Sequence, residues 1–299
     1  MSIRRKYTVS ENNYYERLDR FLRNVLKDLK LGSIYKLIRT GNIIINGKEA
    51  RKPFLKLSVG DSVEVNYSGN EEPLKRLEEK REPQPLNLPL EFIYEDDYLI
   101  AVDKPPGISM HPGKGIQIVT IIEGLLAYGE NKGFKPRLVH RLDKHTSGVL
   151  VVAKTPEAAR RITEMFKNRD IDKYYVTLIK GNLERNTDKL TDFEGKEKME
   201  LNYSVKNAYN VCSLVDVKLL TGKKHQIRIQ FSKRDHPVLG DEVYGDRELN
   251  AHFRKAHNLK RYFLHCSRIE FEHPFSGRRV KFSSKLPDDL TKVKKSLEQ

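Results

Sequence analysis

The spacing of apolar residues predicts a pair of helices near the start of the chain. Between positions 17 and 29 they recur every three or four residues, as on one face of an amphipathic helix: Leu18, Phe21, Leu22, Val25, Leu26 and Leu29. Gly32 interrupts this spacing, and Ser33 is a residue type that caps the start of a helix. We therefore expect a second, short helix that follows Ser33 and ends at Thr40-Gly41.

Strand patterns follow these helices. Three consecutive isoleucines at 43–45 precede Asn46-Gly47, a dipeptide typical of tight turns between antiparallel strands. Alternation of apolar and polar residues at 63–65 predicts another strand. Together these elements predict a compact helix–helix–strand unit between residues 15 and 66.

Beyond residue 89 the pattern changes to several strands with a helix among them. Short apolar or alternating runs predict strands at 92–94, 99–102, 149–153, 174–179 and 213–219. Apolar residues at helical spacing predict a helix at 157–168. This mixture is typical of an α+β fold built on a mainly antiparallel central sheet.

The two patterned regions are separated by a different composition. Residues 67–88 are rich in Ser, Gly, Glu, Lys, Arg and Pro, which is typical of an exposed linker. The sequence therefore predicts an N-terminal domain at 1–66, a linker at 67–88 and a larger domain at 89–299.

The chain is strongly basic. Its 56 lysines and arginines against 41 aspartates and glutamates give a formal net charge of +15. Between residues 17 and 66, eleven basic residues stand against five acidic ones. These bases could simply form a solvated helix face, but a protein this basic usually binds a polyanion, and nucleic acid is the first candidate.

Several functional classes lack support in the sequence. Cys212 and Cys266 are far apart and do not form a zinc-type pair, and the nine histidines show no metal-binding spacing. Nucleotide-binding glycine motifs and a nucleophile elbow are absent as well. No signal peptide or membrane-length apolar run is apparent. We expect a cytoplasmic protein that needs no metal, does not bind membranes and carries out neither dinucleotide nor ATP chemistry.

One acidic residue lies in an unusual setting. His140-Arg-Leu-Asp-Lys-His-Thr-Ser-Gly places Asp143 among basic residues, directly before an apolar strand. A guanidinium nearby favours the ionised carboxylate, which can act as a nucleophile or stabilise positive charge on a sugar. The plain alternative is an Asp-x-x-Thr turn. A glycosidase is a further alternative, but it would need a second carboxyl group, and only Asp170 and Asp172 lie near.

A resemblance to a known family decides between these alternatives. The segment from about 89 to 288 resembles pseudouridine synthases of the RluA group. Six ordered motifs carry the resemblance: Val102-Asp-Lys-Pro-Pro-Gly-Ile-Ser-Met-His-Pro-Gly, the Asp143 loop, Lys173-Tyr-Tyr-Val-Thr-Leu-Ile-Lys-Gly, Thr221-Gly-Lys-Lys-His-Gln-Ile-Arg-Ile, His236-Pro-Val-Leu-Gly-Asp-Glu-Val-Tyr-Gly-Asp and Phe263-Leu-His-Cys-Ser-Arg. Tyr244-Gly-Asp-Arg-Glu-Leu and Arg261-Tyr-Phe-Leu-His look closest to the RluC branch, which modifies large-subunit ribosomal RNA.

The N-terminal unit resembles a different module, the α-L RNA-binding domain first known from a small-subunit ribosomal protein. The matching residues are Arg17-Leu-Asp-Arg-Phe-Leu, Ile38-Arg-Thr-Gly-Asn-Ile, Ile45-Asn-Gly-Lys and Val59-Gly-Asp. This resemblance implies contact with RNA and implies no chemistry.

The two resemblances together imply a pseudouridine synthase fold and an RNA pseudouridine synthase, an isomerase that consumes nothing and needs no cofactor. Large-subunit (23S) ribosomal RNA is the expected substrate, pre-ribosomal particles are the expected partners, and the expected oligomeric state is a monomer. Transfer RNA as substrate, or a binding-only ribosome-assembly factor, are the alternatives.

The resemblance also assigns roles to individual residues. It implies that Asp143 is catalytic, either adding to the sugar or removing a sugar proton, and that Arg228 pairs with it. Tyr175 is expected to stack on the flipped uracil, with Tyr174 in the core because strand neighbours point to opposite faces. Arg141 is expected to fill the gap that the flipped base leaves in the RNA.

The entry motif supplies two further candidates. Lys104 and His111 are expected either to support the Asp143 loop or to contact phosphate.

Overall fold

The chain forms two compact units. The first consists of Met1–Glu82 with Pro112–Gln117, and the second of Pro83–His111 with Ile118–Gln299. A computed structural model describes residues 2–9, 17–26, 29, 31–68, 83–112, 119–195 and 197–298. Each unit has a hydrophobic core of its own.

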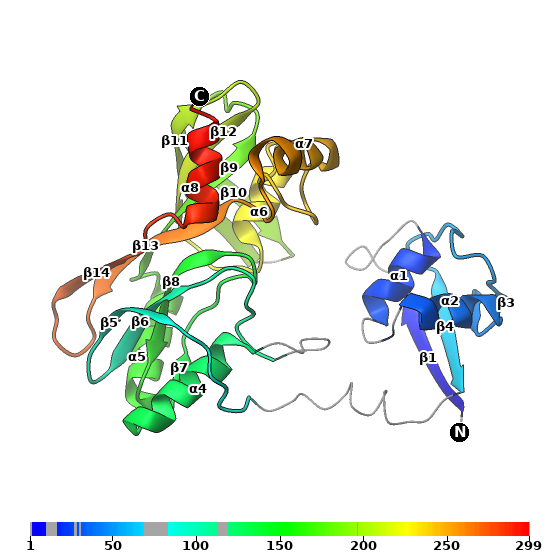
Figure 1. Cartoon of the computed structure of the whole chain (residues 1–299), viewed down its shortest axis with the longest axis horizontal. Helices are drawn as coiled ribbons and strands as arrows, with labels where there is room; N and C mark the ends of the chain where they lie inside the picture. The colour runs from blue at the N-terminus through cyan, green and yellow to red at the C-terminus, as the bar shows by residue number, and fades with distance from the viewer. Residues whose placement is uncertain are drawn as a thin grey trace. The chain divides into compact units, whose positions relative to one another are not determined.

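The first unit packs two helices on a small antiparallel sheet (Figure 1). Its elements are β1 (Ser2–Thr8), α1 (Leu18–Val25), α2 (Leu31–Arg39), β2 (Ile43–Ile45), β3 (Lys48–Glu49) and β4 (Ser62–Ser68). The strand order is β1-β4-β2-β3. The predicted apolar face of the first helix is buried, with Leu18, Phe21 and Leu22 fully enclosed. Burial of this face holds α1 against the sheet.

The predicted turn and strands in this unit are confirmed, but two helix boundaries are wrong. α1 ends at Val25, so Leu26 and Leu29 of the predicted apolar face lie beyond it. Asn46 and Gly47 both have positive φ, 48° and 81°, as a tight hairpin turn between β2 and β3 requires. Ser33 does not cap α2, because the helix already begins at Leu31. Gly32 costs roughly 1 kcal/mol inside a helix, an amount that apolar burial further along α2 can offset.

The second unit is built on a long, mainly antiparallel sheet. Its strands are β5 (Glu91–Glu95), β6 (Leu99–Lys104), β7 (Arg137–Leu138), β8 (Ser147–Ala153), β9 (Asp172–Lys180), β10 (Thr187–Glu194), β11 (Glu197–Ala208), β12 (Cys212–Leu219), β13 (Leu264–Glu272) and β14 (Arg279–Ser283). The order is β10-β11-β12-β9-β13-β8-β6-β5, with β14 beside β13 and β7 beside β8. Only the β13–β8 pairing is parallel among the strands described. The predicted α+β class with a mainly antiparallel sheet is confirmed.

Helices lie at both ends of this sheet (Figure 1). They are α4 (Ile121–Lys132), α5 (Pro156–Asn168), α6 (Gln226–Ser232), α7 (Arg247–His257) and α8 (Asp288–Ser296). The predicted helix at 157–168 is α5, which Thr155 caps by accepting a hydrogen bond from the Ala158 amide at 3.1 Å. Residues 83–88, counted with the linker above, pack along α4, where the Leu86 amide donates to the Glu123 carbonyl.

Candidate active site

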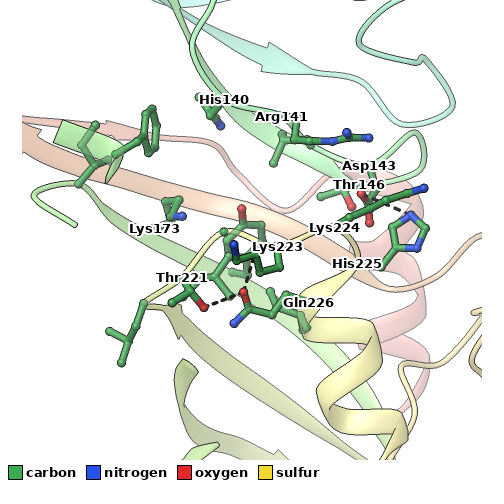
Figure 2. Close-up of a pocket in the computed structure, with 18 of the residues that line it drawn as sticks. His140, Arg141, Asp143, Thr146, Lys173, Thr221, Lys223, Lys224, His225 and Gln226 are labelled. Atoms are coloured by element: carbon green, nitrogen blue, oxygen red, sulfur yellow. Dashed lines mark hydrogen bonds and ion pairs between the residues drawn. The ribbon is translucent and has the colours of Figure 1, made fainter. Parts of the chain in front are cut away.

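A cavity of about 550 Å³ opens in the second unit (Figure 2). Its walls come from the loop before β8, the end of α5 with the start of β9, the start of β11, and the segment that leads into α6. Eight basic and two acidic side chains line it: Arg141, Lys167, Arg169, Lys173, Lys198, Lys223, Lys224, Arg228, Asp143 and Glu197. This excess of positive charge suits a polyanionic ligand.

The loop that carries Asp143 is held in place by Lys104. The Lys104 side chain is completely buried, and its Nζ donates to the carbonyls of Lys144 at 3.1 Å and Thr146 at 2.9 Å. Burial lowers the pKa of Lys104 to about 7. Of its two expected roles, phosphate contact is wrong for this lysine, because it cannot reach solvent. It supports the loop.

The far end of the same loop is fixed by Arg261. The guanidinium donates to the His145 carbonyl at 2.8 Å and to the Ser147 hydroxyl at 3.1 Å. Gly148 has φ of 110°, and a Cβ there would lie 2.1 Å from the Cys266 carbonyl oxygen. Only glycine allows β8 to approach β13 this closely, and that approach fixes where the loop ends and β8 begins.

Asp143 itself faces two basic side chains. Its Oδ2 accepts from Arg228 Nη1 at 3.3 Å, and its Oδ1 lies 3.8 Å from His225 Nε2 (Figure 2). Burial lowers the pKa of His225, although the charge of Asp143 opposes that change. The expected contact between Arg228 and Asp143 is therefore present in the structure.

The main partner of Arg228 is a residue that the sequence analysis missed. Arg228 binds Asp241 through two hydrogen bonds, Nε to Oδ2 at 2.6 Å and Nη2 to Oδ1 at 2.8 Å. Both side chains are buried. Burial opposes both charges, yet the paired bonds raise the pKa of Arg228 and lower that of Asp241. Asp241 belongs to a quoted motif, but only its buried contact with Arg228 reveals a role.

Arg228 lies on α6, which begins after His225, a residue with φ of 55°. Two aromatic rings also contact the guanidinium, with Tyr262 at 4.4 Å and Tyr244 at 5.0 Å from ring centroid to Cζ. Arg228 is thus held by a carboxylate and two rings, which leaves Nη1 directed at Asp143.

Tyr175 and Tyr174 point to opposite faces of β9. Tyr175 is buried and lines the cavity, and burial raises the pKa of its hydroxyl well above the usual value. Tyr174 was expected in the core, which is wrong. Its half-buried ring lies under the guanidinium of Arg268, with 4.0 Å from Cζ to the centroid, and near Lys218. Tyr174 therefore packs against two cations.

Arg141 lies exposed at the cavity and makes no hydrogen bond or ion pair with any residue that the structure describes (Figure 2). His111, its neighbour from the entry motif, is exposed as well. The other carboxylate of the cavity, Glu197, forms an ion pair with Lys223 at 2.7 Å.

The described part of the chain contains no group of three or more His, Cys, Asp or Glu side chains that could hold a metal ion. None of its helices is long and apolar enough to cross a membrane.

Comparison with known proteins identifies the family. Residues 98–233 match the family model of RNA pseudouridylate synthases. The ribosomal large subunit pseudouridine synthase C of Vibrio vulnificus is 33% identical, over 97% of this chain and 95% of that protein. An uncharacterized RNA pseudouridine synthase of Aquifex aeolicus is 32% identical, over 95% of this chain and 94% of that protein. The chain belongs to the RNA pseudouridylate synthase family, as its motifs suggested.

A solved structure agrees on the fold. Human RNA pseudouridylate synthase domain containing 4 superimposes with a TM-score of 0.59 at 21% identity. The match covers 70% of this chain and 93% of the human one.

Proposed function

We propose that this protein isomerises uridines of large-subunit ribosomal RNA to pseudouridine, with Asp143 as the catalytic carboxylate. The observation that carries the proposal is the Asp143–Arg228–Asp241 arrangement at the wall of a basic cavity. The ribosomal target is supported by relatives in Vibrio vulnificus and Escherichia coli whose names state that target and whose sequences align over nearly the whole chain.

The chemistry assigned to Asp143 needs an ionised carboxylate beside the ribose. Asp143 either adds to the sugar carbon C1′ or removes a sugar proton. On both routes the C1′–N1 bond breaks and its electron pair leaves with uracil. The base then turns and C5 bonds to C1′. As it does so, the bond between Asp143 and C1′ breaks on the first route, or the sugar proton is returned on the second. The C5 proton is then lost and N1 gains a proton. Arg228 orients Asp143 and favours its ionised form.

The base must leave the RNA stack to reach Asp143. Tyr175 offers a buried aromatic ring in the cavity on which uracil can stack. Arg141, exposed and without a partner in the described structure, is suited to occupy the gap in the RNA, because a guanidinium is flat and stacks on bases.

The first unit is proposed to be an α-L RNA-binding domain. Exposed cations on α1 and α2, namely Arg20, Arg23, Lys36 and Arg39, could contact phosphates. We further propose that the protein acts as a monomer in the cytoplasm and meets its RNA in pre-ribosomal particles.

The test is pseudouridine mapping of large-subunit RNA from cells that lack this protein. Deletion should remove specific pseudouridines, and the wild type should restore them. Asp143→Asn should not restore them, whereas Asp170→Asn, at an exposed acid outside the cavity, should.

Two results would count against the proposal. Unchanged ribosomal pseudouridines after deletion would refute the ribosomal target, and transfer RNA would then be mapped. Full restoration by Asp143→Asn would refute the catalytic assignment.

A further inference from the structure

Lys173 is a cavity cation without a role in the chemistry described so far. It lies on β9 two residues before Tyr175, so the two side chains share one face of the sheet. Both line the cavity, and Figure 2 shows the Lys173 amine at the cavity wall between His140 and Thr221.

The surroundings of Lys173 supply no counter-charge. Its Nζ lies 5.6 Å from the centre of the Phe166 ring, and a Cβ on Gly222 would be 3.2 Å from it. Within the described part of the chain, Lys173 has no hydrogen bond or ion pair. Burial lowers its pKa. A partly desolvated ammonium without an anion is costly, which indicates that the substrate supplies the missing partner.

The basic side chains of the cavity are of two kinds, which suit the phosphates and the bases of an RNA substrate respectively. Lys167, Arg169, Lys198 and Lys224 are exposed, so they can meet hydrated phosphates at its rim. Lys173 instead lies near the apolar side chains of Phe166, Ile171 and Leu219, which also line the cavity. A planar base fits such a place better than a hydrated phosphate.

We propose that Lys173 contacts the uracil ring and stabilises the negative charge that the ring carries after the C1′–N1 bond breaks. This inference rests on the proposed function. The electron pair of the broken bond spreads from N1 onto the ring carbonyl oxygens, where an ammonium group offsets it. The charge disappears when C5 bonds to C1′. Lys173 therefore serves both possible routes of Asp143, because uracil departs with the same pair in each.

The test separates rate from binding. Wild type, Lys173→Met and Lys173→Arg are compared for single-turnover pseudouridine formation at saturating enzyme, and for RNA affinity across a salt series. Lys173→Met should slow the saturated rate roughly 100-fold, the usual effect of removing one charge-stabilising group. Its affinity should stay within about threefold, because the charge develops only during reaction. Lys173→Arg should recover part of the rate.

The matched control is Lys206→Met, at an exposed lysine on β11 of the same sheet that lies outside the cavity and pairs with Asp216. It should change neither rate nor affinity. Thermal melts establish that each variant is folded. If Lys173→Met does not fold, Lys173→Gln against Lys173→Arg makes the same comparison of a neutral with a charged side chain.

Three results overturn the inference. The first is a saturated rate in Lys173→Met equal to that of the wild type. The second is a Lys173→Arg variant that recovers none of the rate. The third is a Lys173→Met variant that loses only RNA affinity, with a salt dependence of binding that is smaller by about one phosphate contact. Asp143→Asn is measured alongside. If it is as active as wild type, the proposed function fails. If it is inactive while Lys173→Met is normal, only the role of Lys173 fails.

Discussion

At the scale of single residues, Arg228 determines how Asp143 is presented. An arginine has five donors in a rigid fork, so fixing two of them directs a third. Asp241 takes Nε and Nη2, and Nη1 then reaches Asp143. A lysine here could not bind both carboxylates in this geometry. Asp241 is thus a positioning residue that acts through Arg228.

Replacing Asp241 by Asn should therefore affect both stability and activity. The buried Arg228 would lose its main counter-charge, and we expect the free energy of unfolding to fall by about 3 kcal/mol. Urea unfolding measures this loss. Single-turnover rates should fall at least tenfold, because Nη1 would no longer be directed at Asp143 (about 1.4 kcal/mol per factor of ten).

Asp192→Asn is the matched control, since Asp192 pairs with the more exposed Arg234 and lies outside the cavity. It should cost about 1 kcal/mol or less and leave the rate unchanged. The positioning role of Asp241 would be refuted by a normal rate in folded Asp241→Asn.

His140 gives a prediction about pH. Its Nε2 accepts a hydrogen bond from the Val151 amide at 2.8 Å, so the folded state needs the neutral ring. Burial, with the nearby charge of Lys173, lowers its pKa to about 3, far below the ordinary 6.5. Between these values the unfolded chain binds the proton and the folded chain does not. The contribution of His140 to stability is complete above pH 6.5 and is lost as the pH falls from 6.5 towards 3.

The measurement is urea unfolding at pH 7 and pH 5 for wild type and His140→Gln. The wild type should lose about 1–2 kcal/mol more between the two pH values than the variant does. Equal losses would mean that His140 does not need to be neutral in the folded protein. The other histidines are common to both proteins, so only the difference between the two losses is informative.

At the scale of elements, the Asp143 loop is held by residues that are far away in sequence. Lys104 at the end of β6 holds the loop from within, and Arg261 before β13 holds its other side. Such supports place a carboxylate more accurately than a free loop could.

Lys104→Met should loosen the Asp143 loop without unfolding the sheet. Met fills similar space but cannot donate to the Lys144 and Thr146 carbonyls. We expect faster amide hydrogen exchange across 143–147 and a rate that is lower by roughly tenfold. Lys154→Met is the control, because Lys154 pairs with Glu95 outside the cavity. Unchanged exchange in the Lys104 variant would contradict the supporting role.

The same elements show what the sequence could reveal. The strand at 149–153 was predictable because every residue of it is apolar, and it is fully buried. β1 was not predicted, since Ser-Ile-Arg-Arg-Lys-Tyr-Thr has no regular apolar alternation and its strand state depends on pairing with β4. α6 was ambiguous, because the isoleucines at 227 and 229 fit a strand as well as a helix.

The residues of the candidate site likewise divide into those that the sequence reveals and those that only the fold reveals. Asp143, Arg228 and Tyr175 lie in motifs that a resemblance can match. The roles of Asp241 and Tyr262 follow only from their contacts with Arg228 in the folded protein, and a single sequence does not show such contacts. Lys104 lies in a matched motif too, but whether it faces phosphate or the core depends on its burial, which only the fold determines.

At the scale of the whole molecule, we propose that the second unit carries out the chemistry and that the first unit captures RNA. The cavity and every residue proposed for catalysis belong to the second unit, which has its own core. The first unit has a separate core and contributes exposed cations. Because all residues of each core belong to one unit, the units should fold independently.

A fragment of residues 83–299 should therefore unfold cooperatively by itself and isomerise a short RNA at the saturated rate of the full chain. Its affinity for long ribosomal RNA should be at least about tenfold weaker, with a smaller dependence on salt, because the cations of the first unit are gone. The full chain with Arg20, Arg23, Lys36 and Arg39 changed to Gln is the matched control. It should show the same loss of affinity while both cores stay intact. A fragment that binds long RNA as tightly as the full chain, with the same salt slope, would show that the first unit does not capture RNA.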